Sequence, residues 1–330
     1  MTDSSAKPAN EANAAKAKRR GKDSALLLHF YAETPVRAGG AESDGAVDLP
    51  IQREEPTGLP VIWAQSLKGA IKDTLYARDR EDLVPLLGSE PEDRDEQNKR
   101  ATKPGVVDIV DSSLVALPVP TLHSTLAWAT SPLLITRLQR RLRIAKAVTQ
   151  PPSPSRVDPR SAYVCARHSS SLNGRKLAFG PFVLNAEADP AVTELASWIT
   201  GHLLPTEVAG FTEHIQRNLV VVDDQVLAGL ARECTEIHAR VQLHRDPDKL
   251  KTVQNGPFHA EYLPSETIFT SLALGPRDAL AQLGEALGGA WNIGGHESIG
   301  KGLVWCRPEL VTAANGSATD PVATGPAAQS

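Results

Sequence analysis

Hydrophobic residues along this chain are grouped in blocks whose spacing predicts strands and helices in mixed order. The block Ala25–Ala32, ALLLHFYA, is short and almost continuously apolar, which is typical of a buried strand. After a glycine-bearing loop, a helical face follows with its core positions three and four residues apart: Leu67, Ala70, Ile71, Thr74 and Leu75. Ser66 suits the N-cap of this helix, and Lys68 and Lys72 lie together on another of its faces.

A second helix is predicted to begin at Ser131 and Pro132, which suit the N-cap and the first helical position. Its core-facing positions are Leu134, Leu138 and Leu142. The same spacing places three basic residues toward the exposed side: Arg137, Arg140 and Arg141.

The second half of the chain predicts more strands and helices. Lys176–Leu184 indicates a strand, and a helical face follows it: Val192, Leu195, Ala196 and Ile199. The last predicted helix carries Leu280, Leu283 and Leu287, and the chain then reaches a closing strand at Leu303–Cys306. Strands, helices and long insertions in this order favour an α+β fold, a sheet with helices packed on one face.

One strongly alternating segment predicts a half-buried strand: Ile237, Ala239, Val241 and Leu243. Glu266–Leu274 is expected to be its returning partner. The segment between them, His244–Pro264, contains the turn pairs Asp246-Pro247 and Asn255-Gly256, so a protruding hairpin is expected there.

Polar and low-complexity stretches set the expected boundaries. Residues 1–23 and 312–330 lack apolar periodicity and are predicted to be disordered tails around a single domain over residues 24–311. An insertion is expected around residues 147–175, because Thr149–Arg160 is rich in Pro and Ser, and an exposed mobile loop is expected at Gly88–Gly105.

Composition narrows the class of protein. A chain of 330 residues with 41% hydrophobic content can bury a large core, and no apolar run approaches the roughly 18 residues that span a bilayer, so we expect a cytoplasmic protein with no membrane partner. The formal net charge of −4 argues against a protein that coats nucleic acid over its whole surface but allows a local basic groove. Cys165, Cys234 and Cys306 lie too far apart to signal a disulfide framework or a zinc site.

The glycine-rich segment GGHESIGK nearly matches the phosphate-binding pattern of nucleotide hydrolases. Gly302 stands where that pattern needs a hydroxyl residue for magnesium, and the segment leads into a predicted strand instead of a helix, so the nucleotide-hydrolase reading fails. Its glycines still permit close approach of backbone amides to a phosphate. A tight turn between helix and strand is the structural alternative.

Three further features carry candidate chemistry, each beside a plainer explanation. Lys68 and Lys72 at a helix start suit phosphates, although surface solvation is the common outcome. The arginines near residue 140 are as compatible with a solvated face as with a binding groove. Asp48, between Val47 and Leu49, either stabilises a turn or takes part in chemistry.

Four segments in one order resemble the RAMP superfamily: DLPIQREEPTGLPVIWAQSLKGAIK, VVDIVDSSLVALPV with LAWATSPLLITRL, AEYLPSETIFTSL, and IGGHESIGKGLV. The likeness runs from about Leu26 to Trp305 and is greatest to the repeated backbone subunits of type III-B CRISPR (Cmr) effector complexes, with the Csm branch as the nearest competitor. It implies a ferredoxin-like, RRM-like palm, a thumb β-hairpin over 244–264 and irregular fingers-like insertions. It also implies four kinds of partner: guide RNA (crRNA), target RNA, further copies of the chain and other Cmr subunits.

The resemblance also assigns site residues. Asp48 falls on the family's catalytic aspartate, where it would bind a divalent cation (Mg²⁺ or Mn²⁺) weakly or accept the 2′-OH proton, and cleavage of target RNA would proceed by 2′-OH attack. The groove for guide RNA would be lined by Gln65, Ser66, Lys68, Lys72, Arg137, Arg140, Arg141, Gly294, Gly295, His296, Gly300 and Lys301. Arg37 replaces a histidine that many relatives carry and would stabilise phosphate charge.

Some assignments stay open at this stage. Glu261 and Tyr262 would assist the site or simply pack at the base of the hairpin, and Pro120 stands where an arginine contact to RNA is usual. A catalytically silent structural subunit is one rival reading. A stand-alone endonuclease that processes precursor guide RNA is another, with four histidines as candidate bases: His29, His123, His168 and His259.

Overall fold

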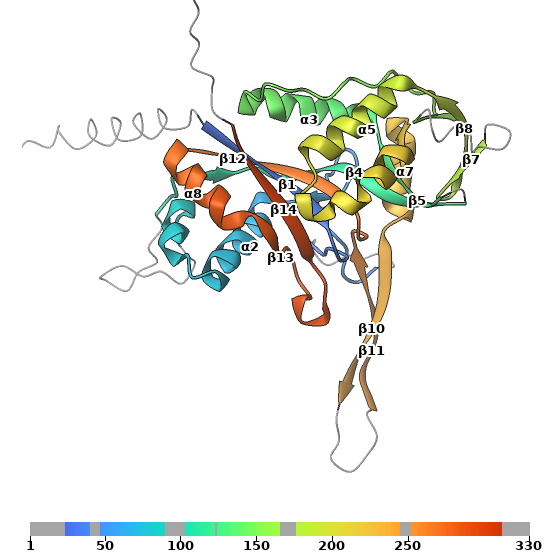
Figure 1. Ribbon diagram of the computed structural model, residues 1–330. Coiled ribbons are helices and arrows are strands. Elements are labelled where there is room, and N and C mark those ends of the chain that lie inside the picture. Colours follow the sequence, from blue (N-terminus) through green and yellow to red (C-terminus); the bar gives the residue numbers. More distant parts are fainter. Residues whose placement is uncertain are drawn as a thin grey trace, which may run out of the picture.

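The computed structural model describes residues 24–39, 47–89, 103–122, 124–165, 176–244 and 252–311 (Figure 1). The two predicted tails and most of the predicted loop at Gly88–Gly105 lie outside these residues. Of the predicted insertion at 147–175, the described part has no helix or strand before β6 (Ser161–Val164), although Val157 is buried.

Four long strands form the centre of a large sheet in the order β14-β1-β12-β4, and every neighbouring pair is antiparallel. Their bounds are β1 Ser24–Ala32, β4 Ser112–Thr121, β12 Ile268–Gly275 and β14 Leu303–Val311. Helix α2 (Ala64–Ala77) lies between β1 and β4 in the chain, and α8 (Arg277–Leu287) lies between β12 and β14. Each helix therefore joins two strands that have a third strand between them, which is the arrangement of two split βαβ units.

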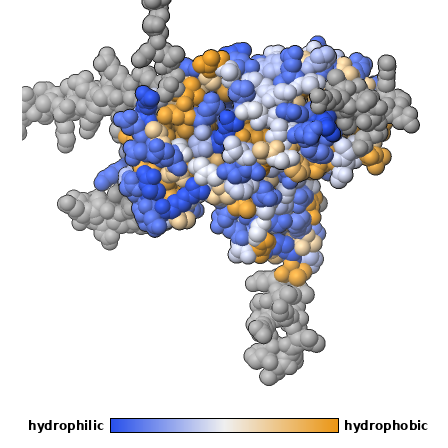
Figure 2. All heavy atoms as spheres, viewed as in Figure 1, coloured by the Kyte–Doolittle hydropathy of each residue, from blue (hydrophilic) through white to orange (hydrophobic). Residues whose placement is uncertain are grey.

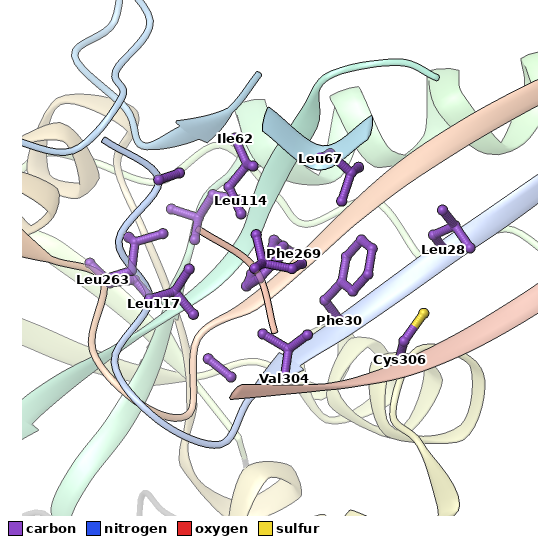
Figure 3. Close-up of a cluster of buried hydrophobic side chains, with 14 of the residues drawn as sticks. Leu28, Phe30, Ile62, Leu67, Leu114, Leu117, Leu263, Phe269, Val304 and Cys306 are labelled. Carbon is purple, nitrogen blue, oxygen red and sulfur yellow. The ribbon is translucent and has the colours of Figure 1, made fainter. Parts of the chain in front are cut away.

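Alternate residues of β1 enter two hydrophobic clusters on opposite faces of the sheet. Leu28 and Phe30 pack with residues of α2 and α8, and Figure 3 shows Phe30 beside Phe269 and Val304 in this cluster. Leu27 and Tyr31 point to the other face, where the cluster includes residues of α3 (Pro132–Ala145) and α5 (Pro190–His202). The expectation of helices on one face is wrong, because α3 and α5 cover the face opposite α2 and α8.

The sheet continues from β4 through β5, β9, β6, β8 and β7. Their bounds, β6 aside, are β5 Thr125–Thr130, β7 Lys176–Phe179, β8 Phe182–Ala188 and β9 Leu219–Val222. The single strand predicted at Lys176–Leu184 is in fact a hairpin, because Gly180 with φ of +53° turns the chain between β7 and β8. The remaining elements are β2 Val61–Ile62, η1 Glu81–Leu87, β3 Asp108–Ile109, η3 Thr206–Phe211, α6 Thr212–Asn218, α7 Asp224–Glu233, β13 Gly289–Asn292 and η4 Glu297–Ile299.

The predicted helix starts had different outcomes. Ser131 caps α3 as predicted, with its side chain accepting from the Leu134 amide. Ser66 is not the N-cap of α2, which begins one turn earlier after Trp63. Gln52 Oε1 accepts from the Trp63 amide at 2.7 Å and an Asp111 oxygen accepts from the Ala64 amide, so side chains distant in sequence cap this helix.

Strands β10 (Glu236–His244) and β11 (Thr252–Tyr262) form a separate two-stranded hairpin that projects from the body (Figure 1). A protruding hairpin was expected, but only its second strand and tip were assigned to it. The alternating segment was predicted to pair with Glu266–Leu274, and this is wrong. Most of Glu266–Leu274 is β12, which pairs with β1 and β4 in the central sheet. Ile237 and Val241 face solvent at 53% and 46% exposure, so their alternation marks an exposed face, and hydrophobic residues are visible beside the grey tip in Figure 2.

Candidate functional site at the root of the hairpin

The glycine loop between β13 and β14 packs against the segment that follows β1. Gly295 N donates to Arg37 O at 3.0 Å, and Arg37 and Gly294 form a parallel bridge. Gly294 has φ of +87°, and a Cβ added there would lie 2.1 Å from Arg37 O. Only glycine fits this contact. The loop is tightly packed, as the turn alternative expected, but it joins strands β13 and β14 instead of a helix and a strand. It places backbone amides beside Arg37.

Tyr262 connects this loop to the root of the hairpin. The side chain is fully buried, and its hydroxyl lies 2.9 Å from His296 Nδ1. Lys301 Nζ stands 5.1 Å from the centre of the Tyr262 ring, a cation–π distance. Tyr262 thus holds His296 and Lys301 at one place on the surface, as a buried positioning side chain.

A cationic cluster surrounds Tyr262; we define it as Arg37, Arg240, His296 and Lys301. Burial lowers the pKa of His296, and the positive charges of Arg240 and Arg37 lower it further. Burial is also the main cause of the lowered pKa of Arg37, and Arg240 adds to it. Arg37 Nε is buried and has no hydrogen bond partner among the described residues. These contacts favour an anion at this place.

The beginning of α2 adjoins the same region through Gln52. Its side-chain nitrogen donates to Gly39 O at 2.9 Å and to Ser66 Oγ at 2.8 Å. Gln65 is exposed next to Ser66. This part of the predicted groove is therefore joined to the segment that carries Arg37.

The two lysines of α2 differ from the prediction that they share an exposed face. Lys72 is 8% exposed, and its Nζ donates to Gly88 O at 2.9 Å and Ser89 O at 3.3 Å, so it holds the end of η1. Lys68 is half-buried, and its pKa is lowered by burial and by Lys72, with Asp108 acting in the opposite direction. Lys72 is a structural residue here, because its ammonium group is turned into the protein.

The three arginines of α3 line a groove of about 410 Å³, but they are not equally accessible. Arg137 pairs with Glu54 at 2.8 Å, and Arg140 is exposed. Arg141 donates to the carbonyls of Thr270 and Asp111, and burial lowers its pKa to about 10. The expectation of an exposed Arg141 is wrong, since its guanidinium is largely buried and donates to backbone carbonyls of two other segments.

Asp48 lies on the other side of the hairpin root. Leu49 pairs with β11: its N donates to His259 O, and its O accepts from Glu261 N, both at 3.0 Å. Asp48 Oδ2 accepts from the His259 amide at 2.6 Å and lies 3.6 Å from His259 Nδ1. The two side chains remain 54% and 44% exposed. The fold therefore joins a carboxylate and an imidazole that are 211 residues apart in the sequence.

Glu261 was predicted either to assist the site or to pack at the base of the hairpin, and the structure supports packing. It is 6% exposed, and its carboxylate accepts from Ile51 N at 3.1 Å, Arg53 at 2.5 Å and Thr235 Oγ1 at 2.7 Å. A carboxylate that accepts from three donors, one of them a paired arginine, has little capacity left for a substrate. The structure therefore corrects the suggestion that Glu261 assists catalysis: it fastens the hairpin to the body.

The described residues contain no group of three or more His, Cys, Asp or Glu side chains that could hold a metal ion. At the hairpin root Asp48 offers an exposed carboxylate, with its Oδ2 already accepting from the His259 amide. One carboxylate fits a magnesium ion whose other ligands are water and substrate phosphates. Asp48 therefore fits a cation that binds together with RNA, and the described residues do not form a resident metal site.

Sequence reasoning missed two important residues. Arg240 carried no signal because it lies in a strand whose partner and orientation were predicted wrongly. His259 was only one of four histidines without a motif. Of the others, His29 is fully buried against Thr270 Oγ1 at 3.0 Å, and His123 and His168 lie outside the described residues.

Comparisons with known proteins place this chain and its fold in one family. Residues 29–305 match the sequence profile of the RAMP superfamily. The chain belongs to the RAMP superfamily, and its mixed α+β architecture is the fold of that family. Within the superfamily it is a homologue of Cmr4: it is 31% identical over 300 residues to the Pyrococcus furiosus protein named CRISPR system Cmr endoribonuclease Cmr4, covering 87% of this chain and 97% of that one.

Two solved structures have the same fold. The crystal structure of oligomeric Cmr4 from Pyrococcus furiosus aligns with a TM-score of 0.66 at 25% identity, covering 88% of this chain and 100% of that chain. A chain in a cryo-EM structure of the type III-B Cmr-beta complex bound to cognate target RNA aligns with a TM-score of 0.62 at 22% identity, covering 86% of this chain and 96% of that chain.

None of the described helices is long and apolar enough to cross a membrane.

Proposed function

We propose that this protein is a guide-RNA-binding backbone subunit of a type III-B CRISPR effector complex, and that it cleaves the paired target RNA at Asp48. A relative at 31% identity is named an endoribonuclease, and a structure of a similar protein is described as oligomeric. The observation that carries the proposal is the exposed Asp48 carboxylate at the root of a protruding hairpin, with the cationic cluster beside the same root.

The six elements β1, α2, β4, β12, α8 and β14 form the ferredoxin-like palm in this proposal, and β10–β11 forms the thumb. Copies of the chain would stack along the guide RNA beside other Cmr subunits. A projecting hairpin in each copy would then meet the RNA duplex at a regular interval. The nucleotide displaced there has no partner, so its ribose is free to rotate.

RNA phosphates would bind at the cationic cluster and the adjoining glycine loop. Arg37 supplies a buried N–H with no partner among the described residues, and Lys301 supplies a point charge. Lys68 and Gln65 extend this surface along α2. Such contacts go to the backbone, so affinity should fall steeply with salt and depend little on base sequence.

Cleavage would occur by attack of a 2′-OH on the adjacent phosphorus, which needs no nucleophile from the protein. Rotation of the ribose brings the attacking oxygen into line, so geometry supplies much of the acceleration. Asp48 would hold a divalent cation (Mg²⁺ or Mn²⁺) together with RNA phosphates. That cation, when bound, neutralises charge that develops on the phosphate.

The test is cleavage of complementary RNA by the assembled, guide-loaded complex with Asp48→Ala. We expect the cleavage rate to fall by about 10²–10⁴-fold with target affinity unchanged. Asp73→Ala removes an exposed carboxylate from α2 and serves as the matched control. Cleavage at the wild-type rate by Asp48→Ala would leave a silent structural subunit as the correct reading.

A further inference from the structure

We infer that His259 is the proton acceptor for the attacking 2′-OH and that Asp48 orients its imidazole. This inference rests on the proposed function, since it concerns the same reaction. It differs from the assignment of proton transfer to Asp48 itself. The observation behind it is a carboxylate and an imidazole that one short backbone pairing places together on an open surface.

The geometry of the pair defines which atom can react. Asp48 Oδ2 is anchored by the His259 amide at 2.6 Å and faces the Nδ1 side of the same residue at 3.6 Å. The longer distance is not yet a hydrogen bond, but catalytic contacts often shorten when substrate binds. A proton on Nδ1 directed at the carboxylate leaves the lone pair of Nε2 to accept another proton.

Other described histidines have different partners. His296 meets the Tyr262 hydroxyl, and His238 meets Glu236 at 3.0 Å. His202 stacks on Trp198, and His214 packs edge-on against Trp128. Carboxylates also lie beside His238 and the fully buried His29, so the His259 ring is distinguished by its place on the exposed hairpin face that carries Asp48. A base oriented by a third group is the recurring design of proton-transfer sites.

The hairpin register supports an open approach to His259. Ala239 is directly opposite His259, and Ile237 is opposite Glu261, so these side chains share one face of the hairpin. Ala239, Ile237 and Val241 are exposed there. A ribose-phosphate link could therefore approach Nε2 from solvent without displacing described protein groups.

The proton transfers balance between the RNA and His259, and a cation held by Asp48 would act on phosphate charge without entering this balance. His259 Nε2 takes the 2′-OH proton as the 2′-oxygen forms a bond to the adjacent phosphorus. The bond from phosphorus to the 5′-oxygen breaks, and that oxygen leaves with a proton from the imidazolium or from water. The products are a 2′,3′-cyclic phosphate and a 5′-hydroxyl. Asp48 stabilises the imidazolium through charge and is not itself consumed.

The experiment uses the assembled, guide-loaded complex and single-turnover cleavage of bound target RNA. We expect His259→Gln to slow cleavage by about 10²–10³-fold while target affinity and guide content stay unchanged. His259→Gly should be similarly slow, and free imidazole should restore its rate by at least about tenfold, because the ligand occupies the vacated space. His202→Gln, on the distant helix α5, is the control for loss of an imidazole.

The pairing of Asp48 with His259 has its own readout. Residues that act as a unit are not additive, so the double variant Asp48→Asn with His259→Gln should be no slower than the slower single variant. Imidazole should not rescue His259→Gly when Asp48 is also changed to Asn. A wild-type rate for His259→Gln, or slow cleavage with no imidazole rescue, overturns the inference. A wild-type complex that binds target RNA without cutting it overturns the proposed function instead.

Discussion

The two faces of the β10–β11 hairpin root are chemically different although their residues alternate along the same strand. Tyr262 and Arg240 point toward the glycine loop, where positive charge accumulates around a buried ring. His259 points to the opposite face, beside Asp48 and exposed apolar side chains. Alternation along β11 thus separates a surface suited to phosphate binding from one suited to proton transfer.

This separation teaches that binding and cleavage should fail independently. Changes at the cationic cluster should alter affinity and its salt dependence, while changes at Asp48 and His259 should alter the rate on bound RNA. A third kind of change, in the turn that follows the hairpin, should alter stability alone. Changes in the glycine loop, in the cationic cluster and in that turn probe the packing, the binding face and the stability separately.

The largest effect, a loss of folding stability, is expected from Gly294→Ala, because the added Cβ would push the glycine loop away from Arg37. The new Cβ would lie 2.1 Å from Arg37 O in a left-handed conformation, so unfolding should become easier by about 2–4 kcal/mol. Gly300→Ala is the matched control: its φ is +77°, but nothing lies within 4 Å of an added Cβ. That variant should lose only about 1–2 kcal/mol. Urea denaturation measures both, and equal losses would contradict the close packing of the loop.

A smaller effect is expected from Lys301→Ala on the cationic face. Target or guide RNA affinity should fall by about 1 kcal/mol, and the slope of log affinity against log salt should become shallower by about 1, because one phosphate contact is lost. Cleavage of RNA already bound should continue at the wild-type rate. Binding titrations at several salt concentrations measure this, with Lys176→Ala on β7 as control. An unchanged affinity with slower cleavage would merge the two faces into one site.

The smallest effect concerns Glu266, in the turn between the hairpin and β12. Its Oε2 is buried with no hydrogen bond partner among the described residues, and burial raises its pKa from 4.5 to about 7. The folded state therefore keeps a proton that the unfolded state loses between about pH 4.5 and 7, so this group's stabilisation is lost as pH rises through that window.

Glu266→Gln cannot ionise, so its melting temperature should fall less than that of the wild type between pH 5 and pH 8. Glu187→Gln, at an exposed position on β8, is the control. RNA affinity and cleavage should be unchanged at either pH. Equal pH dependence in the wild type and Glu266→Gln would show that the buried carboxyl is solvated after all.

Local patterns predicted the elements whose residues act close together in sequence. The continuous block of β1, the cap at Ser131 and the leucine spacing of α8 each satisfy their own requirements within one or two turns. The glycine loop was also recognisable, because few other residues tolerate its backbone. Family resemblance added Asp48, which no spacing could single out.

Long-range contacts explain what local patterns could not predict. In the sequence Lys72 and Arg141 have the pattern of surface residues. In the structure their side chains donate hydrogen bonds to backbone carbonyls from elsewhere in the chain. The alternation in β10 was assigned to a half-buried strand, because nothing in a single strand reveals whether its apolar face is covered. The approach of His259 to Asp48 depends on Leu49 pairing with β11, a contact between distant segments.

The backbone hydrogen bonds of Leu49 to His259 and Glu261 attach the Asp48 segment to strand β11 of the hairpin. If the hairpin tilts, the Asp48 carboxylate and the His259 imidazole would therefore move together. Such a tilt would shift the position of this pair along a bound RNA strand and would keep the two side chains together.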